Sequence, residues 1–260
     1  MRTDNVTVIK IGGSLLDKGK FERWIRSLAS FLKRHPVVLI HGGGKEVTEL
    51  CGKLGIATRF VQGRRFTDDA TMSAAEMVLS GKVNPAIVAQ LNRAGVHAVG
   101  LSGRDGAAVS AKRVASLGRV GVPNKVRVPL IRSMLSRKIL PVFSSIADDG
   151  KGGALNVNAD EMASAIAAAL GAKRLILYTD VPGVLDASKN TIPHITEKMS
   201  RELIQTGVIS GGMIPKINSS FQALRKGIGE IWILEGTLPI RQAKGTVLSN
   251  RAVTAKHPFR

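Results

Sequence analysis

Val37-Val-Leu-Ile-His-Gly-Gly-Gly-Lys45 couples a short apolar run to three consecutive glycines. Four aliphatic residues in a row predict a strand buried on both faces, as in parallel sheets. The glycines predict a turn into the helical pattern at 45–54, and a helix that begins there offers unpaired N–H groups to a carboxylate or phosphate. A purely structural turn is the alternative. The stretch is neither a Walker loop nor a G-x-G-x-x-G fingerprint.

The same order of strand and helix recurs along the chain. Short apolar runs predict strands at 6–11, 37–40, 96–101, 139–145, 173–179 and 230–235. Helical spacing predicts helices at 21–32, 45–54, 69–80, 82–94, 161–170 and 213–226. We therefore predict an α/β fold, a three-layer αβα sandwich with a largely parallel central sheet.

The chain shows no internal repeat or low-complexity tract. Residues 104–127 interrupt the alternation and predict a hairpin-like insertion. Asn158 and Asp160 are both good N-cap types for the alanine-rich helix predicted at 161–170, and Gly171 is placed to end it. We predict a single domain over residues 1–260, with approximate lobes at 1–170 and 171–260.

The composition is that of a globular protein. The chain has 260 residues, of which 44% are hydrophobic and 4% aromatic, which argues against disorder and for an aliphatic core. Cys51 is the only cysteine, so an internal disulfide is excluded. No apolar run is long enough to cross a bilayer, and the N-terminal residues do not resemble a signal peptide. We expect a cytoplasmic protein with no membrane partner.

The charge is strongly positive, at +19. Such a field attracts anionic substrates or partners, and nucleic-acid binding is one alternative explanation. The basic residues are dispersed, however, and no basic stripe with interleaved aromatic residues is present. The sequence therefore does not favour specific nucleic-acid recognition, and solvated Lys and Arg faces explain the charge equally well.

Two lysines lie next to glycines far apart in the chain. Lys10 lies in Val8-Ile-Lys-Ile-Gly-Gly-Ser14, and Lys216 lies in Gly211-Gly-Met-Ile-Pro-Lys216. Glycine turns bring backbone N–H groups close to phosphate oxygens, and a lysine supplies a point charge. Phosphoryl transfer needs little beyond positioned positive charge around the migrating group, so the sequence predicts a kinase.

Three further polar segments are candidate site elements. Asn156, Asn158 and Asp160 alternate and share one face of an extended chain, where they could hold a substrate and orient the lysines. Two turn residues and a helix cap are the alternative. Arg65 could bind a carboxylate through two hydrogen bonds, although Arg64 beside it leaves the assignment open by one position. Residues 178–184 follow a predicted strand and fit either a nucleotide-binding loop or an ordinary turn.

Two other kinds of chemistry are not supported by the sequence. The five histidines lack metal-ligand spacing and no Cys/His cluster is present, so we predict no protein-bound metal. Ser14 and Ser102 lack the His-Asp support that a serine triad requires, so a serine triad is not expected.

Together these segments resemble the amino acid kinase family. The resemblance covers roughly residues 6–248, and within the family it is strongest to the branch that phosphorylates N-acetyl-L-glutamate. It is carried by six segments in family order, at 10–13, 41–45, 100–106, 156–160, 179–184 and 211–216.

The resemblance implies transfer of the ATP γ-phosphoryl group to the side-chain carboxylate of N-acetyl-L-glutamate, a step of arginine biosynthesis. Lys10 and Lys216 match catalytic lysines that stabilise the moving phosphoryl, and Asp160 matches the aspartate that organises both. The acceptor-binding positions are Gly43, Gly44, Arg65, Asn156 and Asn158. The nucleotide-binding positions are Gly12, Gly13, Thr179, Asp180, Val181, Pro182, Gly183, Val184, Val208, Ile209 and Ser210. Mg²⁺ is expected with ATP, held mainly by phosphates and water.

The resemblance also bears on domain organisation and partners. It makes 1–170 the amino-acid substrate lobe and 171–260 the nucleotide lobe. Arginine-inhibited members carry an extra N-terminal helix, whereas this chain begins almost at its first strand, so we expect a homodimer without arginine feedback through such a helix.

Two alternative functions stay open. One is a kinase for aminoadipate or glutamate linked to an acidic carrier protein, which the positive charge would suit. The other is a non-catalytic, nucleic-acid-binding regulator of the same fold.

Overall fold

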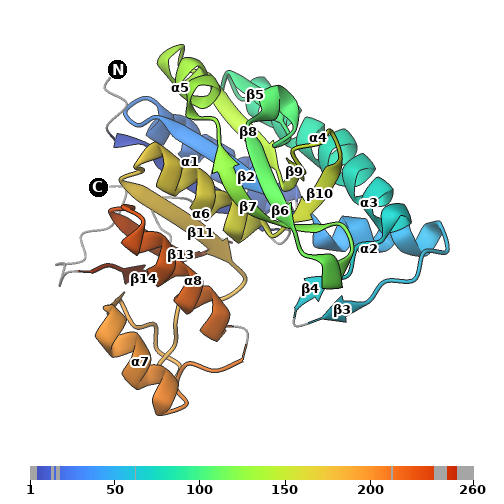
Figure 1. The fold of residues 1–260 in the computed structure, drawn as a ribbon. Coiled ribbons are helices and arrows are strands. Elements are labelled where there is room, and N and C mark those ends of the chain that lie inside the picture. Colours follow the sequence, from blue (N-terminus) through green and yellow to red (C-terminus); the bar gives the residue numbers. More distant parts are fainter. Residues whose placement is uncertain are drawn as a thin grey trace.

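The structure is a computed structural model that describes residues 5–12, 15, 18–61, 63–211, 213–236 and 245–250. A twisted eight-stranded sheet runs through the molecule in the order β12-β14-β13-β11-β1-β2-β8-β5 (Figure 1). All six predicted strands lie in it: β1 Thr7–Ile11, β2 Val37–His41, β5 Ala98–Leu101, β8 Leu140–Ser144, β11 Arg174–Thr179 and β13 Glu230–Glu235. The prediction of a largely parallel central sheet is confirmed, since only β13 and β14 pair antiparallel within it.

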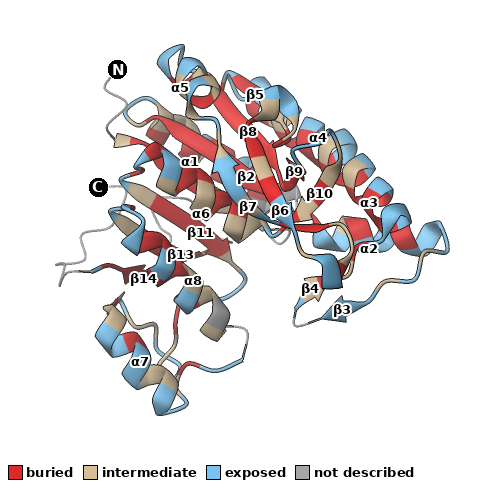
Figure 2. Cartoon of the chain, viewed as in Figure 1, coloured by how far each residue is buried: buried red, intermediate tan, exposed pale blue. Residues whose placement is uncertain are grey.

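Helices cover both faces of this sheet. The described helices are α1 Lys18–Leu32, α2 Gly44–Lys53, α3 Asp69–Glu76, α4 Asn84–Arg93, α5 Val128–Ser136, α6 Ala159–Leu170, α7 Glu197–Gln205 and α8 Met213–Arg225. Buried residues of α5, α6 and α8 pack on one face, and those of α1 to α4 pack on the other. The strands alternate between these two cores: Val38 and Ile40 of β2 face the first, whereas Leu39 faces the second. Three layers result, and Figure 2 shows the central strands buried between them.

Three parts of the fold differ from the predicted elements. The predicted helices at 69–80 and 82–94 are not separate, because a π-helix, η3 Met77–Val83, joins α3 to α4. Helices α5 and α7 fall outside the predicted set, as do two short strands at one side of the sheet, β12 His194–Ile195 at the edge and β14 Gly245–Leu248 next to it. Strands of two and four residues are too short for their sequences to carry a clear periodic signal.

The predicted insertion is a small barrel beside the main sheet. Its strands are β6 Val109–Arg113, β7 Val120–Val126, β9 Ile146–Asp148 and β10 Ala154–Val157, and η4 Asp105–Ala107 and η5 Ala115–Leu117 are short 3₁₀ helices next to them. The hairpin prediction is confirmed, since β6 and β7 pair antiparallel. A second hairpin, β3 Phe60–Val61 and β4 Arg64–Arg65, projects from the main body and is exposed at its tip (Figure 2).

The connection from the barrel to the main sheet passes through α6. Asn158 is the N-cap of this helix, because its Oδ1 accepts hydrogen bonds from the N–H groups of Asp160 at 2.8 Å and Glu161 at 3.2 Å. Gly171 ends the helix in a left-handed conformation, φ 61°. The predicted end at Gly171 is confirmed, whereas the helix begins two residues earlier than predicted and its cap is Asn158 rather than Asp160. The sheet continues past Gly171, since β1 pairs with β11 in parallel.

None of the helices in the described ranges combines the length and the apolar character needed to cross a membrane.

Candidate active site

Three charged side chains from different elements meet beyond the carboxyl ends of the central strands. Lys10 Nζ of β1 lies 3.0 Å from Asp160 Oδ1, and Lys216 Nζ of α8 lies 3.1 Å from Asp160 Oδ2. Asp160 is in the first turn of α6, 56 residues before Lys216. Ligands of open α/β sheets bind in crevices at this edge. The structure thus brings together the three residues predicted to be catalytic.

Electrostatics keep this cluster ionised. Burial by itself would raise the pKa of Asp160, but the ammonium groups of Lys10 and Lys216 outweigh burial and hold the pKa below its ordinary value. The carboxylate is therefore charged at neutral pH, and one negative charge lies between two positive ones. The excess positive charge is available to an anion.

The β2–α2 turn supplies backbone donors near this edge. Gly43 is the N-cap of α2, and a Cβ at Gly43 would lie 2.7 Å from Leu79 Cδ2, so any other residue there would force Leu79 to shift. A Cβ at Gly44 would meet no heavy atom within 4 Å, so space is open there. The first N–H groups of a helix have no intrahelical partners and carry the positive end of its dipole. The turn therefore suits a carboxylate or phosphate.

Arg65 and Arg64 differ in their surroundings. Arg65 is 8% exposed, and its Nη2 donates to the carbonyl of Gly44 at 2.9 Å and to Thr48 Oγ1 at 2.6 Å. Its Nη1 is buried, and no atom in the described part of the chain accepts a hydrogen bond from it. Arg64 is instead ion-paired with Glu161. Of the two arginines, Arg65 is thus the one whose Nη1 can still donate a hydrogen bond to a bound carboxylate.

A small cleft joins the predicted acceptor-binding residues. It has a volume of about 90 Å³, and its lining includes Arg65, Asn156 and Asn158. The amide of Asn156 donates to Thr67 Oγ1 at 3.2 Å, and Asn158 caps α6 as described above. The cleft does not include Gly43 or Gly44, although Gly44 is tied to Arg65 through its carbonyl.

The predicted nucleotide-binding positions lie on two loops and near β1. Residues 179–184 follow β11 and are fastened to β14, because Thr246 Oγ1 accepts a hydrogen bond from Val184 N at 2.8 Å. Residues 208–210 follow α7 and precede α8, which carries Lys216; Ile209 of this loop is buried. A Cβ at Gly12 would lie 3.8 Å from Lys10 Nζ. Gly13 lies outside the described residues.

Two buried polar residues beside the glycine turn escaped the sequence prediction. His41 Nδ1 is 2.8 Å from the carbonyl oxygen of Gly42, and His41 Nε2 is 3.0 Å from Asn84 Nδ2. Burial lowers the pKa of His41 to about 4, although the hydrogen bond to Gly42 opposes this. A histidine between an apolar run and a glycine run is the one signal that could have drawn attention to it.

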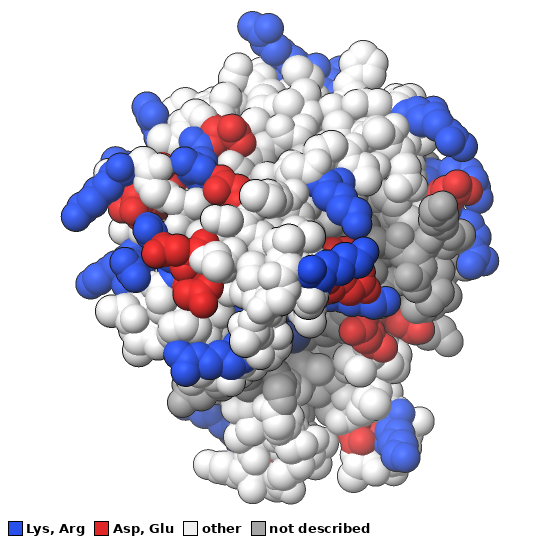
Figure 3. All heavy atoms as spheres, turned by 90° about the vertical axis from the view of Figure 1, so that its right-hand side faces the viewer, with Lys and Arg blue, Asp and Glu red and all other residues white. Residues whose placement is uncertain are grey.

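The described residues bear on metal binding, and the face drawn in Figure 3 bears on nucleic-acid binding. Within the described ranges, no group of three or more His, Cys, Asp and Glu side chains could hold a metal ion. On the face drawn in Figure 3, lysine and arginine side chains are scattered among acidic ones. This face therefore lacks the continuous basic surface typical of nucleic-acid-binding proteins.

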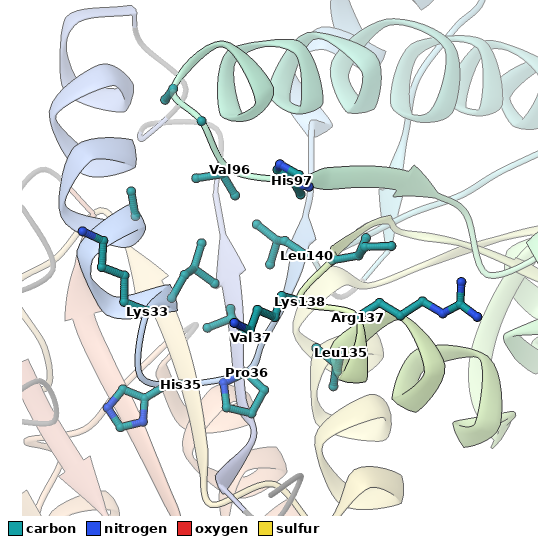
Figure 4. A pocket seen from close by; sticks show the side chains of 15 residues that line it. Lys33, His35, Pro36, Val37, Val96, His97, Leu135, Arg137, Lys138 and Leu140 are labelled. Atoms are coloured by element: carbon teal, nitrogen blue, oxygen red, sulfur yellow. The ribbon is translucent and has the colours of Figure 1, made fainter. Parts of the chain in front are cut away.

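A larger cavity, of about 590 Å³, opens at the other end of the sheet, where the parallel strands begin (Figure 4). Its lining includes Val37, Val96 and Leu140, which stand at or just before the amino ends of β2, β5 and β8. None of the predicted site residues lines it. Lys33, Arg137 and Lys138 on its rim follow the ends of α1 and α5, where positive charge complements helix dipoles. The candidate site therefore consists of the cluster of Lys10, Asp160 and Lys216 together with the smaller cleft that Arg65, Asn156 and Asn158 line.

Comparison with known proteins identifies relatives over nearly the whole chain. The model of the amino acid kinase family matches residues 5–235. An acetylglutamate kinase of Endomicrobium trichonymphae is 44% identical over 244 residues, which are 94% of this chain and 98% of that protein. An acetylglutamate kinase of Azorhizobium caulinodans is 42% identical over 252 residues, which are 91% of this chain and 84% of that protein. Among solved structures, smu.665 from Streptococcus mutans UA159 matches with a TM-score of 0.83 and 29% identity, covering 96% of this chain and all of that one.

Proposed function

This chain belongs to the amino acid kinase family, and on that premise we propose that it transfers the γ-phosphoryl group of ATP to the side-chain carboxylate of N-acetyl-L-glutamate, a step of arginine biosynthesis. The observation that carries the proposal is the position of Asp160 between Lys10 and Lys216. The two relatives reported above are acetylglutamate kinases that align over nearly the full chain.

The proposed reaction requires mainly that the protein position positive charge around the transferred phosphoryl group. The acceptor carboxylate is already ionised at neutral pH, so no general base is needed. Repulsion between two anions must be suppressed instead, and positive charge must be in place where negative charge develops. Lys10 and Lys216 supply that charge, and Asp160 holds both ammonium groups at one point. The N–H groups at the start of α2 add donors that cost no reorganisation.

The residues present fit ATP with Mg²⁺. Two lysines and a helix N-terminus suit a polyphosphate, whereas Asp160, already paired with both lysines, is a poor metal ligand on its own. Mg²⁺ would arrive with ATP, held by phosphate oxygens and water, and would neutralise part of the phosphate charge. Residues 171–260 would form the nucleotide lobe and residues 1–170 the acceptor lobe, joined in one sheet by the pairing of β1 with β11.

Acceptor binding gives a test that separates the two arginines. Arg65→Gln is expected to raise KM for N-acetylglutamate about 10- to 100-fold, because a charge-assisted hydrogen bond to the acceptor is lost. Arg64→Gln is the matched control and is expected to change KM less than about threefold, because Arg64 is already paired with Glu161 and a partly exposed ion pair contributes little. Steady-state kinetics would measure both, with thermal unfolding as a check on folding. The opposite ranking would reassign the carboxylate contact to Arg64.

The proposed reaction is tested by an ATP-dependent hydroxamate assay across N-acetylglutamate, glutamate, aspartate and aminoadipate. We expect kcat/KM for N-acetylglutamate to exceed that for glutamate by about 10²-fold or more, because a pocket that pairs with an acylated amine leaves groups unpaired beside a charged one. Equal efficiency on both acceptors would contradict the proposed substrate. Turnover only of a carrier-linked acceptor would replace it with the carrier-dependent reaction.

We also propose that the protein is a homodimer. Strand β5 is the last strand of the sheet within the described ranges, and Val99 on it is 41% exposed. Met77 of η3 is 63% exposed. An uncovered edge strand is a surface that proteins usually pair or protect. Sedimentation equilibrium would distinguish a dimer from a monomer.

A further inference from the structure

His41 and Asn84 form a buried polar pair under the glycine turn, and neither touches the three charged residues of the site. His41 is 0% exposed at the end of β2, and Asn84 is 4% exposed at the start of α4. The amide Nδ2 of Asn84 lies 3.0 Å from His41 Nε2 and 2.9 Å from the carbonyl oxygen of Val142. Buried polar side chains cost free energy unless their hydrogen bonds are made. The hydrogen bonds of this pair are made, and the question is what these two polar side chains do under the turn.

The direction of each hydrogen bond follows from the partners. A backbone carbonyl only accepts, so His41 Nδ1 carries the proton that it donates to the oxygen of Gly42 at 2.8 Å. The imidazole is neutral at neutral pH, which leaves Nε2 as an acceptor. Val142 O likewise only accepts, so Nδ2 is the side of the Asn84 amide that faces both it and His41. Donation therefore runs from Asn84 to His41 and from His41 to Gly42.

Holding the carbonyl of Gly42 also orients the next N–H group. The peptide unit is planar, so the N–H of Gly43 points opposite to the C=O of Gly42. With that carbonyl directed at the buried imidazole, the N–H of Gly43 is directed away from it. A flanking bond from Gly42 N to the carbonyl of Ile11, at 3.3 Å, ties the same turn to the end of β1. Glycine has no Cβ to restrict its backbone, so such a turn needs external restraints.

The π-helix η3 places the partners of this turn. Asn84 directly follows η3, and Leu79 and Val83 of η3 lie closest to the Cβ position of Gly43 apart from Glu46. On the far side, a Cβ at Gly100 of β5 would lie only 2.0 Å from Asn84 Oδ1, so glycine makes the room for the amide. Single π turns are uncommon and are found mostly at functional sites. Here the π turn sets both the packing against Gly43 and the position of Asn84.

We propose that His41 and Asn84 are positioning residues that fix the Gly42–Gly43 peptide so that the Gly43 N–H faces the reacting anions. The inference rests on the proposed kinase reaction and adds the group that orders its glycine turn. Neither residue contacts substrate in this scheme. They act through the backbone, and removing them would misplace a donor whose position the reaction depends on.

Two isosteric variants of His41 separate positioning from mere packing. The amide nitrogen of asparagine occupies nearly the place of Nδ1, whereas that of glutamine occupies nearly the place of Nε2. His41→Asn therefore keeps a donor for Gly42, and His41→Gln loses it. We expect His41→Gln to lower kcat/KM for N-acetylglutamate about 10- to 100-fold, the scale of a misplaced catalytic group. His41→Asn should stay within about fivefold of wild type, because the donor to Gly42 is kept and only the contact with Asn84 is lost.

Asn84 is tested by a double-mutant cycle with a matched control. If Asn84 acts only through His41, Asn84→Ala should lower kcat/KM in the wild-type background and add little to His41→Gln. Ser80→Ala is the control, because Ser80 is also in η3 and its Oγ lies 2.8 Å from Ser144 Oγ without touching Gly42. We expect the Ser80→Ala enzyme to keep wild-type kcat/KM. Thermal unfolding of each variant identifies any that fail to fold.

Equal activity of folded His41→Asn and His41→Gln would overturn the positioning role, as would full additivity of His41→Gln and Asn84→Ala. Wild-type protein without ATP-dependent turnover of N-acetylglutamate would instead overturn the proposed function. In that case a crystal structure of His41→Gln still tests the restraint itself. A rotated Gly42–Gly43 peptide in the His41→Gln variant is the expected result, and an unchanged one would contradict the inference.

Discussion

Replacement of Lys216 or Lys10 with alanine is expected to lower kcat by about 10²–10³-fold, the usual effect of removing one preorganised charge from a transition state. Each lysine lies about one hydrogen-bond length from Asp160, at 3.1 and 3.0 Å respectively. Either alanine variant removes one of two positive charges and leaves Asp160 paired with the other. The remaining pair is neutral, so the excess positive charge that opposes the negative charge of the phosphoryl group is gone.

The control for this experiment is Lys45→Ala. Lys45 follows the glycine turn in the first turn of α2 and is exposed, so it contributes to the general positive field without belonging to the cluster. We expect its removal to leave kcat within about twofold, because exposed charges are screened by solvent and salt. Rapid-mixing and steady-state kinetics would measure the three variants. Full activity of Lys10→Ala or Lys216→Ala would reject the assigned role of that lysine.

Asp160→Ala is expected to lower kcat by about 10²-fold and to weaken ATP binding less, because charge placement matters more in the transition state than in the ground state. Both ammonium groups lose their common acceptor and repel each other, so neither is held where the phosphoryl group passes. ATP itself still meets two positive charges. The expected signature is therefore a fall in kcat with a small change in KM for ATP.

Glu161→Gln is the matched control for Asp160, since Glu161 is the next residue of α6 and pairs with Arg64 rather than with the lysines. It removes one negative charge from the same helical turn. We expect its effect on kcat to be less than about fivefold, in keeping with the modest worth of partly exposed ion pairs. If the two variants reduced kcat equally, the charge of the helix turn rather than the position of Asp160 would be responsible.

Some features of the fold and of the candidate site could be predicted from the sequence, and others could not. Six of the eight strands of the main sheet were predicted because runs such as Val37–Ile40 are apolar without a break. The barrel hairpin was predicted from the break in rhythm at 104–127, although β9 and β10 belong to the same barrel and lie well downstream. The π-helix from Met77 to Val83 was not predicted, because its apolar residues are spaced as in an ordinary α-helix. The role of His41 was missed because its partner Asn84 is 43 residues away.

The sequence also could not decide whether Arg64 or Arg65 is the arginine that contacts the acceptor carboxylate. Adjacent positions of a strand face opposite sides, but two arginines in a row leave open which of them is buried. Packing of β4 against α2 resolves the choice, since Arg65 reaches Gly44 and Thr48 while Arg64 reaches Glu161.

Local pattern alone established the alternating α/β architecture, the glycine turn and the residue types that carry charge, because strand periodicity, turn chemistry and helix caps depend on neighbours within a few positions. The distances within the candidate active site were decided by strand order. Asp160 stands between Lys10 and Lys216 because β1 lies against β11 and α6 packs beside α8, and no periodicity encodes which strands become neighbours. Such contacts between distant segments arise from burial of the two cores as a whole, so they exist only in the folded chain.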